Sequence, residues 1–144
     1  MTTDNPNPNH FGAVCPYLNV DNIDKQMEFL HHVFNAEVKE TLKNSDGIVL
    51  HGELVIGNVV IMLGKGSSGF PAQPSINYIY VRDADLVYNK AMEHGATPIY
   101  PPDDKFYGLR EAGFKNMHDN TWFIAQHIKD VTAEEMEKGF ADKK

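Results

Sequence analysis

The sequence predicts an α+β fold in which two βαβββ modules form a half-barrel around a cavity. The order strand, helix, strand, strand, strand runs over about residues 13–64 and starts again at about residue 75. The amino-acid sequence also contains an internal repeat, because PYLNVDNID (16–24) aligns with NYIYVRDAD (77–85) at an offset of 61. Each sheet has one face covered by its own helix, so the other face needs cover from the second sheet or from a ligand.

A chain of 144 residues is long enough for one domain with a substantial core. We expect that domain at residues 11–130, with modules at about 13–64 and 75–127. Residues 1–10 are polar and contain two prolines, which predicts a disordered lead. Residues 131–144 are expected to form a short helix and a tail, because Thr-Ala-Glu-Glu at their start is a capping box.

The first module begins with a strand at AVCPYLNV (13–20), followed by a helix that Asp21 or Asn22 caps. Asn35 can adopt the left-handed conformation that ends a helix. The apolar face of this helix is predicted from residues at helical spacing, namely Ile23, Met27, Leu30 and Phe34.

Three strands complete the first module: AEVKETLK, IVLHGELVI and VVIMLG. NSDG separates the first two, and Gly57-Asn58 is a two-residue hairpin signal between the last two. The stretch GKGSSGFPAQP (64–74) is rich in Gly, Ser and Pro and predicts a flexible joint.

The second module begins with the strand SINYIYV, and Asp83 caps the helix ADLVYNKAMEH, which Gly95 ends. The stretches TPIY, KFYGL, EAGFKN and NTWFIAQ are expected to be further strands, with a polar turn at His118-Asp119-Asn120.

Composition and charge exclude some classes of partner. The net charge is −7, from 13 basic and 20 acidic residues, which disfavours nucleic acid and anionic membranes as main partners. With Cys15 as the only cysteine, the chain forms no disulfide of its own and no cysteine-based zinc site. The N-terminus has no signal-peptide pattern and no apolar run reaches transmembrane length, so a cytoplasmic protein is expected.

Four stretches carry a resemblance to a known family: PYLNVDNIDKQMEFLHHVFNAE, HGELVIGNVVIML, YVRDADLVYNKAMEHGA and FYGLREAGFKNMHDNTWFIAQH. With them, most of residues 13–127 resembles the vicinal oxygen chelate superfamily, which includes glyoxalase I, extradiol dioxygenases and bleomycin-resistance proteins. The chain is most similar to the small glyoxalase/bleomycin-resistance and PhnB-like members. The fold supports many activities, so the resemblance implies the fold more directly than a function.

The resemblance also implies where a metal would be held in the metal-using members, where four strands each give one His or Glu. Carried over strand by strand, those positions fall on Cys15, Met62, Ile76 and Phe123. None is an oxygen or imidazole ligand of the kind that a divalent metal needs. The floor of the cavity is therefore expected to be apolar and free of metal, with no cofactor.

His51 and Glu53 are two residues apart in LHGELVI, so their side chains point to the same face of a strand. They are either a general acid/base pair that faces the cavity or a polar pair on a solvated face. They are the candidate catalytic residues of this sequence.

Aromatic residues and one arginine are the other candidates for ligand contact. Phe106 and Tyr107 could stack on a flat ligand and Arg110 could hold an anionic group, or Arg110 could pair with Asp103 or Asp104. Tyr17, Tyr78 and Tyr80 alternate on strands that should flank the cavity, although ordinary core packing would also explain each of them. Trp122 is expected in the core, and Cys15 has no nearby His that would make it a nucleophile.

The favoured function is a small-molecule-binding protein of the bleomycin-resistance kind, which binds an amphipathic or aromatic compound in the half-barrel cavity without a metal. The predicted ligand-binding residues are Cys15, Tyr17, Met62, Ile76, Tyr78, Phe106, Tyr107, Arg110 and Phe123. The alternative is a glyoxalase-like lyase or isomerase that uses His51 and Glu53, and a third possibility is a cavity filled by the protein's own side chains. The resemblance also implies a homodimer, with modules paired within a chain or exchanged between chains.

Overall fold

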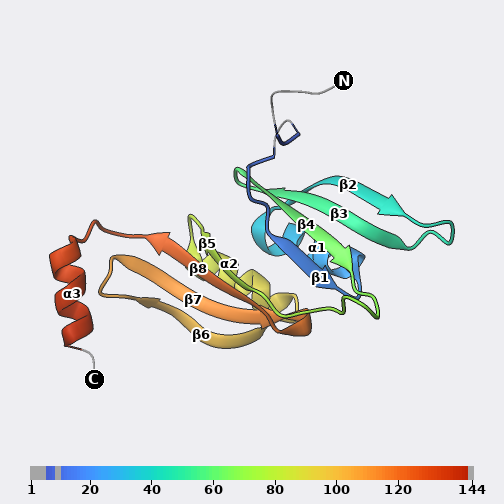
Figure 1. Cartoon of the computed structure of the whole chain (residues 1–144). Coiled ribbons are helices and arrows are strands. Elements are labelled where there is room, and N and C mark those ends of the chain that lie inside the picture. The colour runs from blue at the N-terminus through green and yellow to red at the C-terminus, as the bar shows by residue number, and fades with distance from the viewer. Residues whose placement is uncertain (1–5, 9–10, 143–144) are drawn as a thin grey trace. The chain divides into compact units, whose positions relative to one another are not determined.

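The computed structural model describes residues 6–8 and 11–142. The chain divides into two compact units. The first consists of the residues up to Ser75 together with Met117–Asp119, and the second of Ile76–Asn116 together with the residues from Asn120 onward. Each unit contains a four-stranded sheet, as the predicted α+β fold of two βαβββ modules requires (Figure 1).

The first sheet has the strand order β1-β4-β3-β2, with β1 parallel to β4 and the other pairs antiparallel. Its elements in chain order are β1 (Tyr17–Val20), α1 (Ile23–Phe34), β2 (Glu37–Lys43), β3 (Val49–Ile56) and β4 (Val59–Lys65). The long connection from β1 to the parallel strand β4 therefore contains α1 and a β-hairpin.

Helix α1 packs against one face of the first sheet at very short range. A Cβ atom at Gly52 in β3 would meet the terminal methyl of Met27 and press on Ile23, so these two side chains of α1 lie directly on the strand at this point. The buried apolar side chains of this unit lie between the helix and the sheet, and they include Ile23, Met27, Leu30, Val33, Leu18, Val20, Leu54, Ile61 and Leu63. Phe34, which was predicted on this face, is only partly buried, and Val33 takes the buried position.

The second sheet repeats this arrangement with the order β5-β8-β7-β6, where β5 is parallel to β8. Its elements are β5 (Ile76–Tyr80), α2 (Ala84–Glu93), β6 (Thr97–Asp104), β7 (Leu109–Asn116) and β8 (Asn120–His127). A short 3₁₀ turn (Met117–Asp119) joins β7 to β8, and helix α3 (Ala133–Ala141) follows the sheet.

Helix α2 covers one face of the second sheet and buries its largest side chains. Trp122, Phe114 and Ile124 have no measurable exposure, and Tyr88 of α2 packs edge-on against Phe114 at a centroid distance of 6.4 Å. The buried indole of Trp122 donates a hydrogen bond of 2.8 Å to Asn116. The prediction of Trp122 as a core residue is confirmed.

The ends of both helices follow the predicted signals. Asn22 and Asp83 are the N-caps, and each side chain accepts a hydrogen bond from a backbone N–H in the first turn. Asn35 adopts left-handed dihedral angles (φ 57°, ψ 32°) at the end of α1, and Gly95 has φ 87° just after α2. Thr132 caps α3 through the amide of Glu135, as the capping box predicts.

Three predicted boundaries are wrong, each for a local reason. The first strand begins at Tyr17 rather than residue 13, because Pro16 has no N–H and only its carbonyl pairs, with the amide of Met62. KFYGL is not a strand of its own, since Gly108 has φ 85° and closes a turn before β7. Lys65 belongs to β4 rather than to the joint. Most of the predicted lead at residues 1–10 lies outside the described residues.

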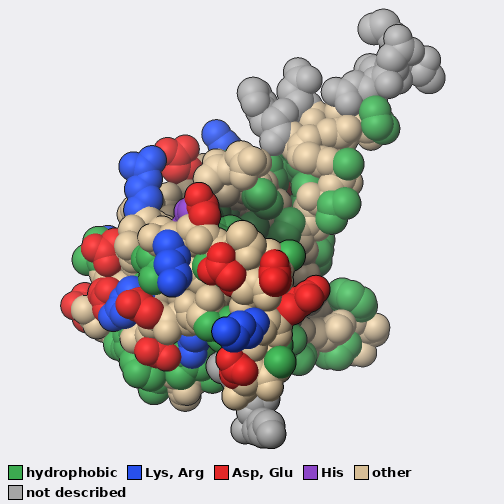
Figure 2. Space-filling model, turned by 90° about the vertical axis from the view of Figure 1, so that its left-hand side faces the viewer, with side chains coloured by type: hydrophobic (Ala, Val, Ile, Leu, Met, Phe, Trp, Pro, Cys, Tyr) green, Lys and Arg blue, Asp and Glu red, His purple; other side chains and the backbone are tan. Residues whose placement is uncertain are grey.

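Charged side chains of both signs are interspersed on the visible face in Figure 2, with no large basic area there. Among the described residues, no helix is long and apolar enough to cross a membrane.

The turn at Gly108 gives a test of the fold. A Cβ atom there would collide with the backbone carbonyl of Lys129, whereas Gly95 has nearly the same φ and open space around it. We expect Gly95→Ala to cost about 1 kcal/mol of unfolding free energy, from the left-handed conformation alone. Gly108→Ala should cost at least about 1 kcal/mol more, from the collision. Urea denaturation of both variants measures the difference, and equal losses would contradict the close approach of the two backbones.

Candidate ligand-binding site

The face of the second sheet away from α2 carries a row of aromatic rings. In one register row, Tyr78 of β5 pairs with Phe123 of β8, Phe123 with Gly113 of β7, and Gly113 with Tyr100 of β6. The ring of Phe123 lies 6.5 Å from that of Tyr78 and 6.1 Å from that of Tyr100, with the latter pair nearly parallel at 29°. Gly113 has no side chain, and a Cβ there would press on both Phe123 and Tyr100. The row is therefore a continuous aromatic surface.

A buried carboxylate lies beside this row. Glu111 of β7 is only 7% exposed and occupies the register row next to Gly113. Three tyrosine hydroxyls donate hydrogen bonds to it: Tyr78 to Oε2 at 2.5 Å, Tyr100 to Oε1 at 2.6 Å and Tyr107 to Oε1 at 2.7 Å. Hydrogen bonds to a charged acceptor are about twice as strong as neutral ones, which offsets the cost of burying the carboxylate. We call Glu111 and these three tyrosines the tyrosine–carboxylate cluster.

The cluster is arranged to keep Glu111 charged. Burial alone would raise the pKa of Glu111, but the hydrogen bonds from Tyr100, Tyr78 and Tyr107 together hold it below its ordinary value of 4.5. Burial and the same carboxylate raise the pKa of all three tyrosines well above 10.0, so their hydroxyls stay protonated. At neutral pH the cluster therefore carries one negative charge and its three phenols are neutral.

A lysine lies at the edge of the cluster. The Nζ atom of Lys105 is 4.8 Å from the centroid of the Tyr100 ring, which is within cation–π range, and it also donates to Asp103 at 3.4 Å. Lys105 also helps to lower the pKa of Glu111. One ring of the cluster thus already holds a cation that belongs to the protein.

Helix α3 supports the loop that supplies Tyr107. Phe106 packs edge-on against Tyr107 at 5.1 Å and against Phe140 of α3 at 4.9 Å. A Cβ at Gly139 would collide with the ring of Phe106, so α3 lies directly on that ring. Phe106, predicted as a ligand contact, is thus placed between α3 and the tyrosine that reaches Glu111.

In the first unit, His51 and Glu53 lie on the face of β3 away from α1, on the same side as Tyr17 and Met62. The Nε2 atom of His51 is 3.1 Å from Oε2 of Glu53, and both side chains are partly buried. The ring of Tyr17 is 6.3 Å from that of His51 and covers Gly64, where a Cβ would collide with it. The two predicted catalytic side chains therefore form a hydrogen-bonded pair.

The other candidate residues belong to neither of these two groups. Cys15 precedes β1, and its thiol is 3.8 Å from the carbonyl of Gly12. Ile76 is 79% exposed at the start of β5. Arg110 points to the side of the sheet covered by α2, where it forms 2.9 Å ion pairs with Asp85 and Asp104. Its charge is shared between these two carboxylates rather than directed at the aromatic row.

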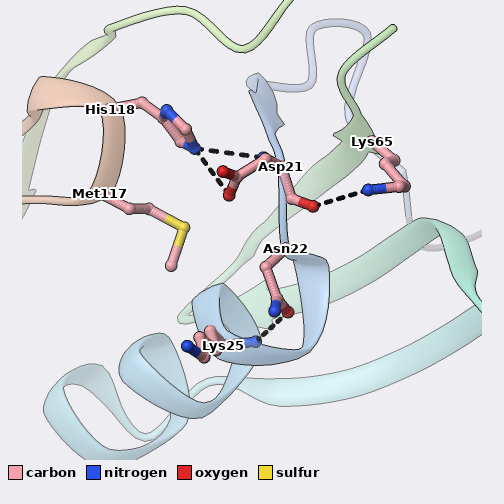
Figure 3. A pocket seen from close by; sticks show the side chains of 6 residues that line it. All are labelled: Asp21, Asn22, Lys25, Lys65, Met117 and His118. Atoms are coloured by element: carbon pink, nitrogen blue, oxygen red, sulfur yellow. Dashed lines mark hydrogen bonds and ion pairs between the residues drawn. The ribbon is translucent and has the colours of Figure 1, made fainter.

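A pocket of about 570 Å3 lies at the start of α1, lined by Asp21, Asn22, Lys25, Lys65, Met117 and His118 (Figure 3). His118 has φ 56° and places Nε2 2.9 Å from a carboxylate oxygen of Asp21, and the hydrogen bond lowers the pKa of Asp21. Lys65 donates to the backbone carbonyl of Asp21 at 2.8 Å. These are exposed contacts, and exposed ion pairs contribute little to stability.

The residues at the four predicted metal positions do not fit a divalent ion. Cys15 and Met62 in the first unit offer soft sulfur atoms, and Ile76 and Phe123 in the second unit offer only hydrocarbon. Within residues 6–8 and 11–142, no three His, Cys, Asp or Glu side chains are grouped closely enough to hold a metal.

Sequence analysis missed Glu111, Tyr100 and Lys105. Alternation in LREAGFKN places Glu111 with Gly113 on the face opposite Ala112 and Phe114, which by itself would predict a solvated carboxylate. Its burial depends on tyrosines from other segments of the second unit, which no local pattern shows. Tyr100 could not be placed from the sequence, because register shifts on both sides of it change how β6 pairs with β7.

The paired βαβββ units define the class of protein. Residues 7–124 match the Glyoxalase/Bleomycin resistance protein/Dioxygenase superfamily. The chain belongs to this superfamily, as its resemblance to the vicinal oxygen chelate proteins implied.

Several proteins are similar over nearly their whole length. A protein of Mycobacterium bovis is 24% identical over 136 residues, which cover 87% of this chain and 90% of that protein. The fosfomycin resistance protein FosX from Listeria monocytogenes has a TM-score of 0.66 at 18% identity, over 86% of this chain and 96% of FosX. The PhnB protein from Bacillus cereus has a TM-score of 0.65 at 14% identity, over 80% and 99%. At these identities the solved structures show a shared fold.

The tyrosine–carboxylate cluster can be tested with a matched pair on β5. Tyr78→Phe removes one donor to Glu111 and should cost about 1 kcal/mol of unfolding free energy at pH 7, because Tyr78 is partly exposed. Tyr80→Phe removes the hydroxyl of a tyrosine that is 69% exposed, and it should change the unfolding free energy little.

The loss of unfolding free energy in Tyr78→Phe should also depend on pH. Because the pKa of Glu111 is lowered in the folded state, its charged form stabilises the folded protein above the ordinary pKa of 4.5. This stabilisation is lost as the pH falls through the folded-state pKa. The difference in unfolding free energy between wild type and Tyr78→Phe should therefore narrow as the pH falls below 4.5. Chemical denaturation at several pH values measures this difference. Equal losses of unfolding free energy in Tyr78→Phe and Tyr80→Phe at every pH would contradict the cluster.

Proposed function

We propose that this protein binds an amphipathic or aromatic small molecule, without a metal, on the face of the second sheet away from α2. The observation that carries the proposal is the aromatic row Tyr78–Phe123–Tyr100 beside the buried Glu111. Flat rings supply apolar contact area, and a few fixed polar groups orient a ligand. The same row contains Tyr78 and Phe123, two of the predicted ligand-binding residues.

Metal independence is supported by the donor set at the predicted metal positions, which offers sulfur and hydrocarbon rather than carboxylate or imidazole. One structure of a FosX variant was determined as a complex with Mn(II) and 1S,2S-dihydroxypropylphosphonic acid. The side chains of this chain favour a different kind of site, in which aromatic contact takes the place of metal coordination.

We also propose a homodimer, in keeping with the superfamily.

Ligand-induced stabilisation tests the proposal. A thermal-shift screen of small aromatic compounds, run with and without EDTA, should give compounds that raise the Tm equally in both conditions. Titration of those compounds should show Phe123→Ala weakening binding by about tenfold or more, as expected for a central aromatic contact.

The matched control is Leu86→Ala, which removes a half-exposed apolar side chain from α2, on the other side of the same sheet. Leu86→Ala should bind the same compounds with a Kd within about twofold of the wild-type value. Stabilisation that EDTA abolishes, or wild-type affinity in Phe123→Ala, would overturn the proposed site.

A second candidate function is a lyase or isomerase, favoured by the 3.1 Å contact between His51 and Glu53. A hydrogen-bonded imidazole and carboxylate can together take up and return a proton. This pair lies on the first sheet, whereas the tyrosine–carboxylate cluster lies on the second.

Metal analysis tests whether His51 and Glu53 hold a metal, as a metal-using lyase or isomerase would require. If binding without metal is correct, purified protein should contain far less than one equivalent of zinc, nickel or iron. One equivalent that is lost in both His51→Ala and Glu53→Ala, but kept in the exposed control His127→Ala, would favour the enzyme. Elemental analysis of the four purified proteins gives the answer.

A further inference from the structure

The direction of the hydrogen bonds in the tyrosine–carboxylate cluster decides which ligands it can attract. A phenol has one O–H donor and two lone pairs. Tyr78, Tyr100 and Tyr107 each direct that donor at Glu111, so none of the three O–H groups remains for a ligand. What the hydroxyls offer to an incoming molecule is their oxygen lone pairs.

The charge of the cluster has the same sign as those lone pairs. Glu111 is negative and buried to 7% exposure, where its field is less screened than at the surface. The faces of the tyrosine and phenylalanine rings also carry negative electrostatic potential from their π electrons. The carboxylate, the oxygen lone pairs and the ring faces therefore all favour a positively charged ligand.

The nearby cations do not cancel this preference. Lys105 lies over Tyr100 and also contacts Asp103, so the three charged groups Glu111, Lys105 and Asp103 sum to one negative charge. Arg110 lies on the other side of the sheet between Asp85 and Asp104. The position of Lys105 over Tyr100 shows that a ring of the cluster accommodates a cation.

We propose that the ligand of this site is an organic cation, a substituted ammonium or guanidinium compound with an apolar or aromatic body. This inference rests on the proposed function and specifies the chemical class of its ligand. The cationic group lies against the rings of Tyr78 and Phe123, because Lys105 already lies over Tyr100, and it is attracted by Glu111, while the apolar body covers the exposed ring surface. Anionic compounds of the same size are excluded by charge, because the cluster offers them no donor.

Three probes of nearly equal size test the charge class. (4-Hydroxyphenyl)trimethylammonium is a cation, 4-tert-butylphenol is its neutral isostere and 4-hydroxybenzoate is an anion. NMR titration of the wild-type protein measures each Kd and maps the contact through the signals of Tyr78, Tyr100 and Phe123. We expect the cation to bind at least about tenfold more tightly than the neutral isostere, and the anion more weakly than both.

A charge-neutral variant links the preference to one residue. Glu111→Gln keeps the shape of the side chain, and we expect it to reduce the cation-to-neutral ratio to about twofold or less. Glu93→Gln, on the exposed end of α2, removes the same charge from the same unit and should leave the ratio unchanged. An unchanged ratio in Glu111→Gln would overturn the role of the carboxylate.

The outcomes separate this inference from the proposed function. If the neutral isostere binds at the aromatic row as tightly as the cation, the site stands and the charge class is overturned. If the anion binds most tightly there, the charge class is likewise wrong. If none of the three probes shifts the signals of the row at millimolar concentration, the proposed site fails and this inference fails with it.

Discussion

The candidate ligand-binding site depends on the burial of one carboxylate among three tyrosine hydroxyls. Removing a carboxylate from water costs several kcal/mol in a protein interior. Hydrogen bonds to charged groups contribute about 1.5–3 kcal/mol each, so three of them are of the same order as that cost. Glu111 can therefore remain charged within the second sheet, and it holds three rings from β5, β6 and the loop before β7 around a single point.

The two modules place different chemistry on equivalent positions of the same scaffold. Tyr17 and Met62 correspond to Tyr78 and Phe123 at the predicted offset of 61. In the next register row, His51 pairs with Gly64 as Glu111 pairs with Ala125. The first module thus has a histidine where the second has the buried carboxylate. The repeated fold fixes where side chains point, and the residues at those positions decide what each sheet can bind.

The sequence predicted the fold well because its signals are local. Caps at Asn22 and Asp83, the left-handed residue Asn35 and the spacing of Ile23, Met27 and Leu30 are read from a few neighbouring residues. The aromatic content of the site was partly predicted through Tyr78 and Phe123, whose positions follow from the alternation of side chains along β5 and β8. The failed strand at KFYGL shows the limit, since a glycine with positive φ turned the chain where propensity favoured a strand.

The chemistry of the site was harder to predict, because it depends on contacts between residues far apart in the sequence. Tyr78 reaches Glu111 over 33 positions, and Arg110 reaches Asp85 over 25. No local pattern tells that Arg110 faces α2 whereas its neighbour Glu111 faces the rings. Strand parity gives the two faces, but register and the position of the helix decide which face holds the site.

The most direct test is the pKa of Glu111 itself, measured by NMR titration of its side-chain carboxyl carbon in the folded protein. The structure predicts a value below the ordinary 4.5, because three donors stabilise the charged form. A value above 4.5 would mean that burial dominates and that the tyrosines do not hold a charged carboxylate, and it would contradict the account.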